Sequence, residues 1–147
     1  MATELSREEI DLLLCESGVG VLALTNGSEA YSIPESFGYD GETLYFQFVF
    51  TSGSKKMALL ETTDTASFTV YDEQPAQSVL VQGPVESVPE GNEPKAATAI
   101  AENASIPTLN VYPDTPPDEF TMEFYRLRPT AVTGRQFSAF TPTPDDQ

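Results

Sequence analysis

The chain has 147 residues, enough for one domain with a buried core, and its 39% apolar content is ordinary for a folded protein. Seven Lys and Arg residues stand against 23 Asp and Glu residues, and the net charge of −16 argues against nucleic acid and anionic membranes as partners. There is no histidine and only one cysteine, Cys15, so the chain lacks the commonest general base and the ligands of zinc or iron–sulfur sites, and we expect no metal centre.

The acidic residues are scattered along the chain rather than gathered in one tail. Scattered carboxylates with few lysines are typical of proteins kept soluble at molar salt, where screening removes self-repulsion. We therefore expect a halophilic source, with an ordinary acidic protein as the alternative. The sequence contains neither a run of about 18 apolar residues nor a basic-then-apolar leader, which predicts a cytoplasmic protein without a membrane span.

The first predicted element is a helix over residues 6–17, in which Ser6 and Glu9 form a capping box and Gly18 supplies the stop. Its apolar stripe consists of Ile10, Leu13 and Leu14. A buried strand is predicted next, over residues 19–25.

The turn "NGSE" leads into a second strand, "AYSIPESFGY", over residues 30–39. Pro34 cannot donate to a ladder, so this strand is expected at a sheet edge or bulged near its middle. A tight turn at 40–42 then precedes the aromatic strand "TLYFQFVF" over 43–50.

A short helix is predicted over 54–63, with Met57, Leu60 and Leu59 facing inward. Strands follow over 65–73 and over 77–88, the second interrupted by a bulge or corner at Gly83-Pro84. The remaining predictions are a weaker helix over 93–104, a loop at 110–119, one or two strands over 120–137 and a mobile tail over 138–147.

This order of elements predicts a single domain over residues 1–147, mainly β with flanking helices. Six or seven antiparallel strands in so small a domain favour a closed or nearly closed barrel, because closure removes exposed edges.

The segment "SGSKK" (52–56) is the main candidate binding motif, because two of the few basic residues stand side by side in it. Gly53 lets a backbone approach closely, Ser54 can cap the helix that follows, and a helix N-terminus attracts anions. Lys55 and Lys56 add two full charges in the first turn. The motif predicts a small phosphate site, and the alternative is a pair of solvated surface lysines.

Two further segments could hold a flat heteroaromatic ring. "YSIPESF" (31–37) and "LYFQF" (44–48) are predicted neighbouring strands with interleaved apolar and polar groups, and Gln77 and Ser78 begin a later strand. Each segment is by itself equally compatible with ordinary sheet.

In order and spacing these segments resemble the pyridoxamine 5′-phosphate oxidase-like family of FMN-binding split barrels. The resemblance covers about residues 4–137, and is closest to the short acidic members from salt-loving archaea. Its parts are "GVGVLALT", "YSIPESFGYDGETLYFQF", Ser-Lys-Lys at a helix start, "ASFTVY", "SVLVQGPVESV" and "VTGR".

The resemblance implies a homodimer with two FMN sites at the subunit interface. It places Lys55 and Lys56 at the FMN phosphate, with Ser54 at the helix start, and Ser78 at the polar edge of the ring. It further places the backbone of Ile33, Pro34, Glu35 and Ser36 along the isoalloxazine, and Gln47 and Phe48 beside the ribityl chain and phosphate.

The sequence departs from the family at several of these positions. Many members have His-Ser where Gln47 and Phe48 stand and an arginine near Lys55, and Phe48 offers no hydroxyl to a phosphate. The arginines that bind the substrate phosphate in true oxidases have no recognisable counterpart, and Arg126, Arg128 and Arg135 match no family role. We therefore do not expect oxidation of vitamin B6.

The leading hypothesis is an FMN-dependent oxidoreductase of unknown substrate. A second is a degenerate or non-catalytic dimeric flavin-binding module that acts in storage, sensing or interaction. A third, F420 or haem in place of FMN, is weaker. Haem loses ground because the chain has no histidine to ligate its iron, although a tyrosine or Cys15 could serve.

Overall fold

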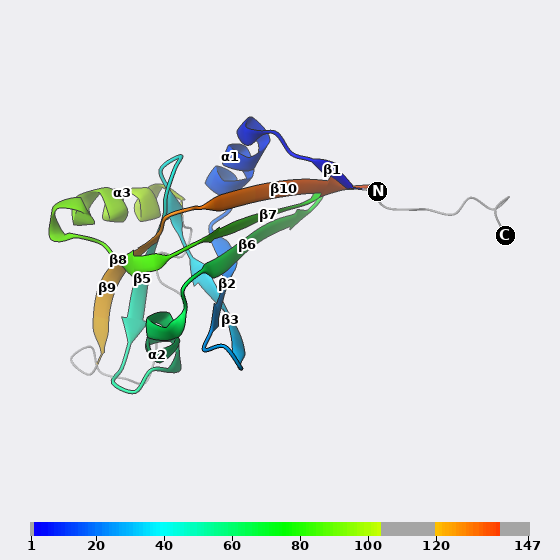
Figure 1. Ribbon diagram of the computed structural model, residues 1–147. Coiled ribbons are helices and arrows are strands. Elements are labelled where there is room, and N and C mark those ends of the chain that lie inside the picture. The colour runs from blue at the N-terminus through cyan, green and yellow to red at the C-terminus, as the bar shows by residue number, and fades with distance from the viewer. Residues whose placement is uncertain (1, 104–119, 139–147) are drawn as a thin grey trace, which may run out of the picture.

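The computed structural model describes residues 2–103 and 120–138, which form two antiparallel sheets with flanking helices (Figure 1). The six-stranded sheet has the order β1-β10-β7-β6-β2-β3: β1 (Ala2–Glu4), β10 (Ala131–Phe137), β7 (Ala76–Gly83), β6 (Ala66–Glu73), β2 (Val19–Thr25) and β3 (Ala30–Ser36). The four-stranded sheet has the order β4-β5-β9-β8: β4 (Gly38–Tyr39), β5 (Leu44–Phe50), β9 (Thr121–Leu127) and β8 (Val85–Ser87). The helices are α1 (Arg7–Glu16), α2 (Lys55–Thr62) and α3 (Glu93–Asn103), the last preceded by the short 3₁₀ helix η1 (Glu90–Asn92).

The predicted fold class is confirmed, but the described residues contain ten strands rather than six or seven. The predicted strands over 30–39, 77–88 and 120–137 each divide in two, because the chain passes from one sheet to the other within them. β1 is an addition that no pattern predicted. The predicted loop at 110–119 and almost all of the predicted tail lie outside the described residues.

The corner at Gly83-Pro84 is confirmed, since β7 belongs to the six-stranded sheet and β8 to the four-stranded one. A β-carbon at Gly83 would collide with the carbonyl oxygen of Arg128, in the link between β9 and β10. Glycine is therefore required here by close approach of two backbones rather than by its dihedral freedom.

α1 begins with the predicted capping box. The Glu9 N–H donates to Ser6 Oγ (3.2 Å) and the Ser6 N–H donates to Glu9 Oε1 (2.9 Å). The predicted stripe of Ile10, Leu13 and Leu14 is buried, as amphipathic spacing requires.

The space between the sheets is filled by aromatic rings. Phe37, Phe46, Phe48 and Phe68 are all fully buried, and their contacting ring centroids lie 5.1–5.4 Å apart. A second cluster, of Tyr45, Val88, Ala96, Ala99 and Ile100, joins α3 to the four-stranded sheet. The interior described here is thus packed with side chains.

The predicted turn at 40–42 is organised by Asp40. Its Oδ1 accepts from the backbone N–H groups of Thr43 (2.7 Å) and Glu42 (2.9 Å), and its Oδ2 accepts from the Tyr45 hydroxyl (2.9 Å) and faces Lys95 (3.2 Å). Desolvation alone would raise the pKa of the Asp40 carboxyl, but these donors outweigh it and lower that pKa.

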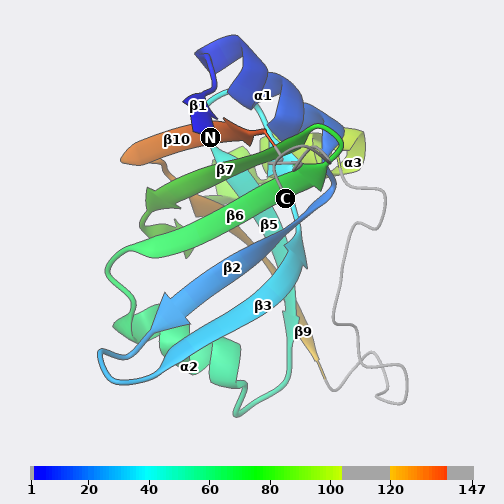
Figure 2. The same cartoon turned by 90° about the vertical axis from the view of Figure 1, so that its right-hand side faces the viewer.

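One face of the six-stranded sheet, which we call the outer face, is not covered by any of the described helices (Figure 2). Figure 2 shows β7, β6, β2 and β3 turned to the viewer with α1 above them and α2 and α3 behind. Three large apolar side chains of these strands and of β10 are exposed there: Val19 (39%), Tyr71 (64%) and Phe137 (45%). Exposed apolar side chains that gather on one sheet face are typical of surfaces that bind a ligand or another chain.

Candidate functional site

The helix start predicted to cradle a phosphate has the expected backbone. Gly53 adopts a left-handed φ of 82°, and the Met57 N–H donates to the Oγ of Ser54, which is the N-cap of α2. After this N-cap, the side chains of Lys55 and Lys56 lie in different environments, one exposed and one buried.

Lys55 is the exposed member of the pair. Its side chain is 56% exposed, and its Nζ donates to Glu29 Oε1 (2.7 Å) and lies 5.6 Å from the centroid of the Tyr31 ring. The Glu29 carboxylate raises the pKa of the Lys55 ammonium, so this group is a cation at any physiological pH. Its partner lies at the β2–β3 turn, which ties the start of α2 to one end of β3.

Lys56 points into the interior, which no pattern in the sequence signalled. Its side chain is 6% exposed, and its Nζ donates to Glu35 Oε1 (2.8 Å), whose side chain is only 2% exposed. The same Nζ lies 4.4 Å from the centroid of the buried Phe48 ring. The structure therefore joins three predicted site residues, Glu35, Phe48 and Lys56, but as a buried ion pair beneath an aromatic ring.

The other residues predicted on β3 lie along a sheet edge. Ile33 packs against the interior cluster, Pro34 is exposed on the outer face, and Ser36 is 3% exposed. The Ser36 Oγ has no hydrogen-bond partner among the described residues. Because buried hydroxyls are normally paired, this oxygen is a candidate ligand contact.

Gln47 does not accompany Phe48. Successive side chains of β5 point to opposite sides, so Phe48 joins the interior rings while Gln47 lies partly buried on the other side, opposite Phe124 of β9. No ligand is needed to account for either placement.

A row of six side chains crosses the outer face and contains two of the three predicted serines, Ser36 and Ser78. Strand register places Ser36 beside Val19, Tyr71 beside Ser78, Ser78 beside Arg135, and Arg135 beside Glu4. β2 and β6 pair as far as Val21 opposite Thr69, and extending this register by two residues places Val19 opposite Tyr71. We call this set the outer row: Ser36, Val19, Tyr71, Ser78, Arg135 and Glu4. Hydroxyls therefore stand near both ends of a strip that carries an exposed tyrosine ring.

The three C-terminal arginines separate into two environments. Arg126 Nε (2.9 Å) and Arg128 Nε (2.7 Å) both reach Oε1 of Glu86 across β8 and β9. Arg135 belongs to the outer row and has no ion pair or hydrogen bond with the described residues. Sequence alone could not separate it from the other two, because the separation depends on strand register.

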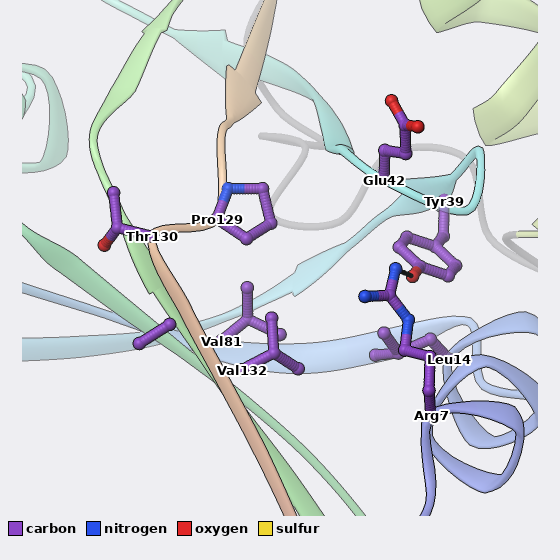
Figure 3. A pocket seen from close by; sticks show the side chains of 9 residues that line it. Arg7, Leu14, Tyr39, Glu42, Val81, Pro129, Thr130 and Val132 are labelled. Carbon is purple, nitrogen blue, oxygen red and sulfur yellow. Dashed lines mark hydrogen bonds between the residues drawn. The ribbon is translucent and has the colours of Figure 1, made fainter.

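A hollow of about 350 Å³ lies away from all these residues (Figure 3). Leu14, Val81 and Val132 form its floor, and Arg7 lies beside Tyr39 at its rim. The Arg7 guanidinium donates to Asp11, to the Tyr39 hydroxyl and to the carbonyl of Gly41, and so fastens α1 to the turn before β5. Burial, and next the hydrogen bond to Asp11, raise the pKa of Tyr39 to about 12. None of the predicted site residues lines this hollow.

Residues 2–103 and 120–138 offer neither a metal site nor a membrane-spanning helix. No group of His, Cys, Asp and Glu side chains there could hold a metal ion. Nor does that part of the chain contain a helix long and apolar enough to cross a membrane.

The two antiparallel sheets, the aromatic interior and the flanking helices define a split-barrel protein, and comparison with known proteins gives its family. The family model described as pyridoxamine 5′-phosphate oxidase matches residues 6–136, so the chain belongs to that family. A search of curated proteins finds no match.

Solved structures of the same architecture come from several bacteria. An FAD-binding protein from Mesorhizobium loti is 25% identical, with a TM-score of 0.74 over 94% of this chain and 99% of that one. The FAD-binding protein of Mycobacterium smegmatis is 24% identical, with a TM-score of 0.70 over 94% and 100%. The FAD- and haem-binding protein of Mycobacterium smegmatis is 17% identical, with a TM-score of 0.70 over 99% of this chain and 77% of its own. The last two likenesses concern the fold alone.

Proposed function

We propose that the protein binds a flavin nucleotide, FMN, along β3 and the outer row, and acts as a small oxidoreductase of its family. The observation that carries the proposal is the buried, unpartnered Ser36 hydroxyl at one end of β3, with the exposed cation Lys55 near the other. β3 has seven residues and is therefore about 20 Å long, which sets the scale of a ligand that spans both ends. The similar structure from Mesorhizobium loti is an FAD-binding protein, which supports the flavin class.

In this proposal the phosphate lies at the N-terminus of α2 with Lys55. The Lys55–Glu29 pair is exposed, and exposed pairs are easily exchanged for another anion. Moving Lys56 to the phosphate would instead leave the Glu35 carboxylate buried without its cation, which costs about 3–5 kcal/mol. Lys55 therefore carries the phosphate contact that we first expected both lysines to share, and Lys56 supports β3 from inside.

The ring lies at the other end, where Ser36 and Ser78 offer hydroxyls and Ile33 and Pro34 belong to an edge strand. Flavin supplies the hydride or electron chemistry, and the protein supplies position and polarity. The residues of this chain hold the ring against the sheet and present hydroxyl groups to its polar edge.

The proposal includes a homodimer that covers the outer face. Val19, Tyr71 and Phe137 are exposed on one uncovered sheet, and a second copy that packed there would bury them together with the ring. Size-exclusion chromatography with light scattering tests this part of the proposal, and a monomer at all concentrations would refute it.

Titration with FMN, FAD and riboflavin, followed by flavin fluorescence, tests the binding site. Wild-type protein is expected to prefer FMN to riboflavin, and Lys55→Gln to weaken FMN binding about tenfold while riboflavin binding stays unchanged, since a tenfold change corresponds to about one charge-assisted contact. Lys95→Gln, which removes an equally exposed cation paired with Asp40, is the matched control. Failure of the wild type to bind any flavin in high salt would end the proposal.

One observation favours a second candidate, a flavin-binding module without turnover. Lys56 and Phe48 lie in the interior, and the chain has no histidine, so the site offers few groups that could move a proton. Assays with NAD(P)H or a reduced deazaflavin donor separate the candidates, because reproducible turnover excludes the second.

A further inference from the structure

Arg135 stands apart in the charge arrangement of the molecule. All seven basic side chains of the chain fall in the described residues, and six of them form ion pairs with acidic side chains of those residues. Arg135 is the seventh and forms no ion pair with the acidic side chains in residues 2–103 and 120–138. Arg135 is exposed and has no carboxylate partner among the described residues, so its guanidinium can meet an incoming anion.

The surroundings of Arg135 form a small binding surface. A hollow of about 320 Å³ on the outer face is lined by Ser78, Leu80, Thr133, Arg135 and Phe137. These side chains supply a guanidinium, two hydroxyls and an apolar edge with one aromatic ring. The guanidinium presents paired N–H donors in a planar fork that matches a carboxylate or a phosphate.

The geometry points to an anion-binding subsite at Arg135, which takes a carboxylate or phosphate monoester carried on a flat apolar body. The hydroxyls of Ser78 and Thr133 stand beside the anion, and Phe137 and Leu80 contact the body. Anion binding here stands on the geometry alone. The further inference that this anion is part of the substrate rests on the proposed function, because Ser78 lines both the subsite and the proposed flavin site.

Glu4 is the nearest carboxylate by register and sets the strength of the subsite. It lies across from Arg135 on β1 and does not pair with it, although directly opposed side chains are close enough to interact. An incoming anion must therefore compete with Glu4 for the guanidinium. Neutralising Glu4 should strengthen anion binding, whereas neutralising Arg135 should abolish it.

Calorimetric titration with benzoate, phenyl phosphate and neutral benzamide tests the subsite at constant ionic strength. We expect at least one anionic probe to bind wild-type protein at least tenfold more tightly than benzamide, and the stronger of the two identifies carboxylate or phosphate as the preferred group. Arg135→Gln should reduce that probe to the level of benzamide, Arg135→Lys should retain part of its affinity, and Glu4→Gln should raise it at least twofold. Lys95→Gln, which removes the same charge elsewhere, should leave it unchanged.

Three results would overturn the inference. Equal affinities of the anionic probes and benzamide would do so, as would equal effects of Arg135→Gln and Lys95→Gln. A change of oligomeric state in Arg135→Gln without a change in probe affinity would show that the guanidinium serves a carboxylate of a second copy. Because the probes need no flavin, the two proposals can fail separately. A protein that binds benzoate or phenyl phosphate but not FMN refutes only the proposed function, and one that binds FMN but neither anionic probe refutes only the subsite.

Discussion

Replacing Lys56 by methionine should destabilise the protein severely, although the residue lies at the edge of a short helix. Methionine retains the apolar length of the lysine stem and removes only the ammonium. The Glu35 carboxyl group, 2% exposed, would then lose its cation, and breaking such a buried pair costs about 3–5 kcal/mol. That is a large part of the roughly 5–15 kcal/mol that stabilises an ordinary domain, and it corresponds to a fall in Tm on the order of 10 °C.

The double variant Glu35→Gln/Lys56→Met isolates the cause of this loss. Replacing both members of a buried pair by neutral residues is often close to neutral, so the double variant should recover more than half of the loss. Urea unfolding followed by circular dichroism measures the effect at constant ionic strength, and an unchanged m-value shows that the change is one of stability. Lys55→Met, which breaks the exposed pair with Glu29, should unfold at the wild-type midpoint.

Equal midpoints for Lys56→Met and Lys55→Met would refute the reasoning, because the buried pair would then contribute no more than the exposed one. A double variant as unstable as Lys56→Met would also refute it, because the loss of stability would then come from packing around Phe48 rather than from the broken ion pair.

Two further predictions concern the scaffold. Asp40→Ala should lower the free energy of unfolding by about 1–2 kcal/mol at pH 7, through loss of its turn hydrogen bonds. Because the folded-state pKa of Asp40 is lowered, its contribution to stability is fully present above pH ~4 and is lost as the pH falls through the folded value. The difference in unfolding free energy between Asp40→Ala and wild type, measured by urea unfolding, should therefore be smaller at pH 3 than at pH 7. A difference that is the same at both pH values would contradict this. Gly83→Ala should destabilise by at least about 2 kcal/mol, because its β-carbon meets the Arg128 carbonyl, whereas Gly91→Ala, with open space around it, should stay within about 0.5 kcal/mol of wild type. Similar melting temperatures for these two glycine variants would contradict the close approach at the corner.

The features that sequence predicted correctly are those encoded by neighbours in the chain. The Ser6–Glu9 capping box needs residues three positions apart, and the Pro34 edge strand and the Gly83-Pro84 corner follow from what proline and glycine do to a local backbone. These signals hold wherever the segment is placed in the fold.

The features that sequence missed depend on contacts between distant segments. Lys56 turns inward because Glu35, 21 positions away, meets it there, and an adjacent pair of lysines carries no sign that one is buried. The place of Arg135 beside Ser78 follows from the register of β10 on β7, which is fixed only when the sheet forms. Arg135, which matched no role in the sequence, owes its importance to such a contact.

The pairing of β1 with β10 has a consequence for the order of folding. Residues 2–4 are made first, but their ladder partners, residues 135–137, come more than 130 positions later. β10 also separates β1 from the rest of its sheet, so that one edge of β7 stays unpaired until β10 arrives. During synthesis on a ribosome, the six-stranded sheet can be completed only after residues 131–137 have emerged, and pairing over such a separation in sequence is slow. A fragment that ends before residue 131 should therefore associate through the open edge of β7 rather than fold as a smaller domain.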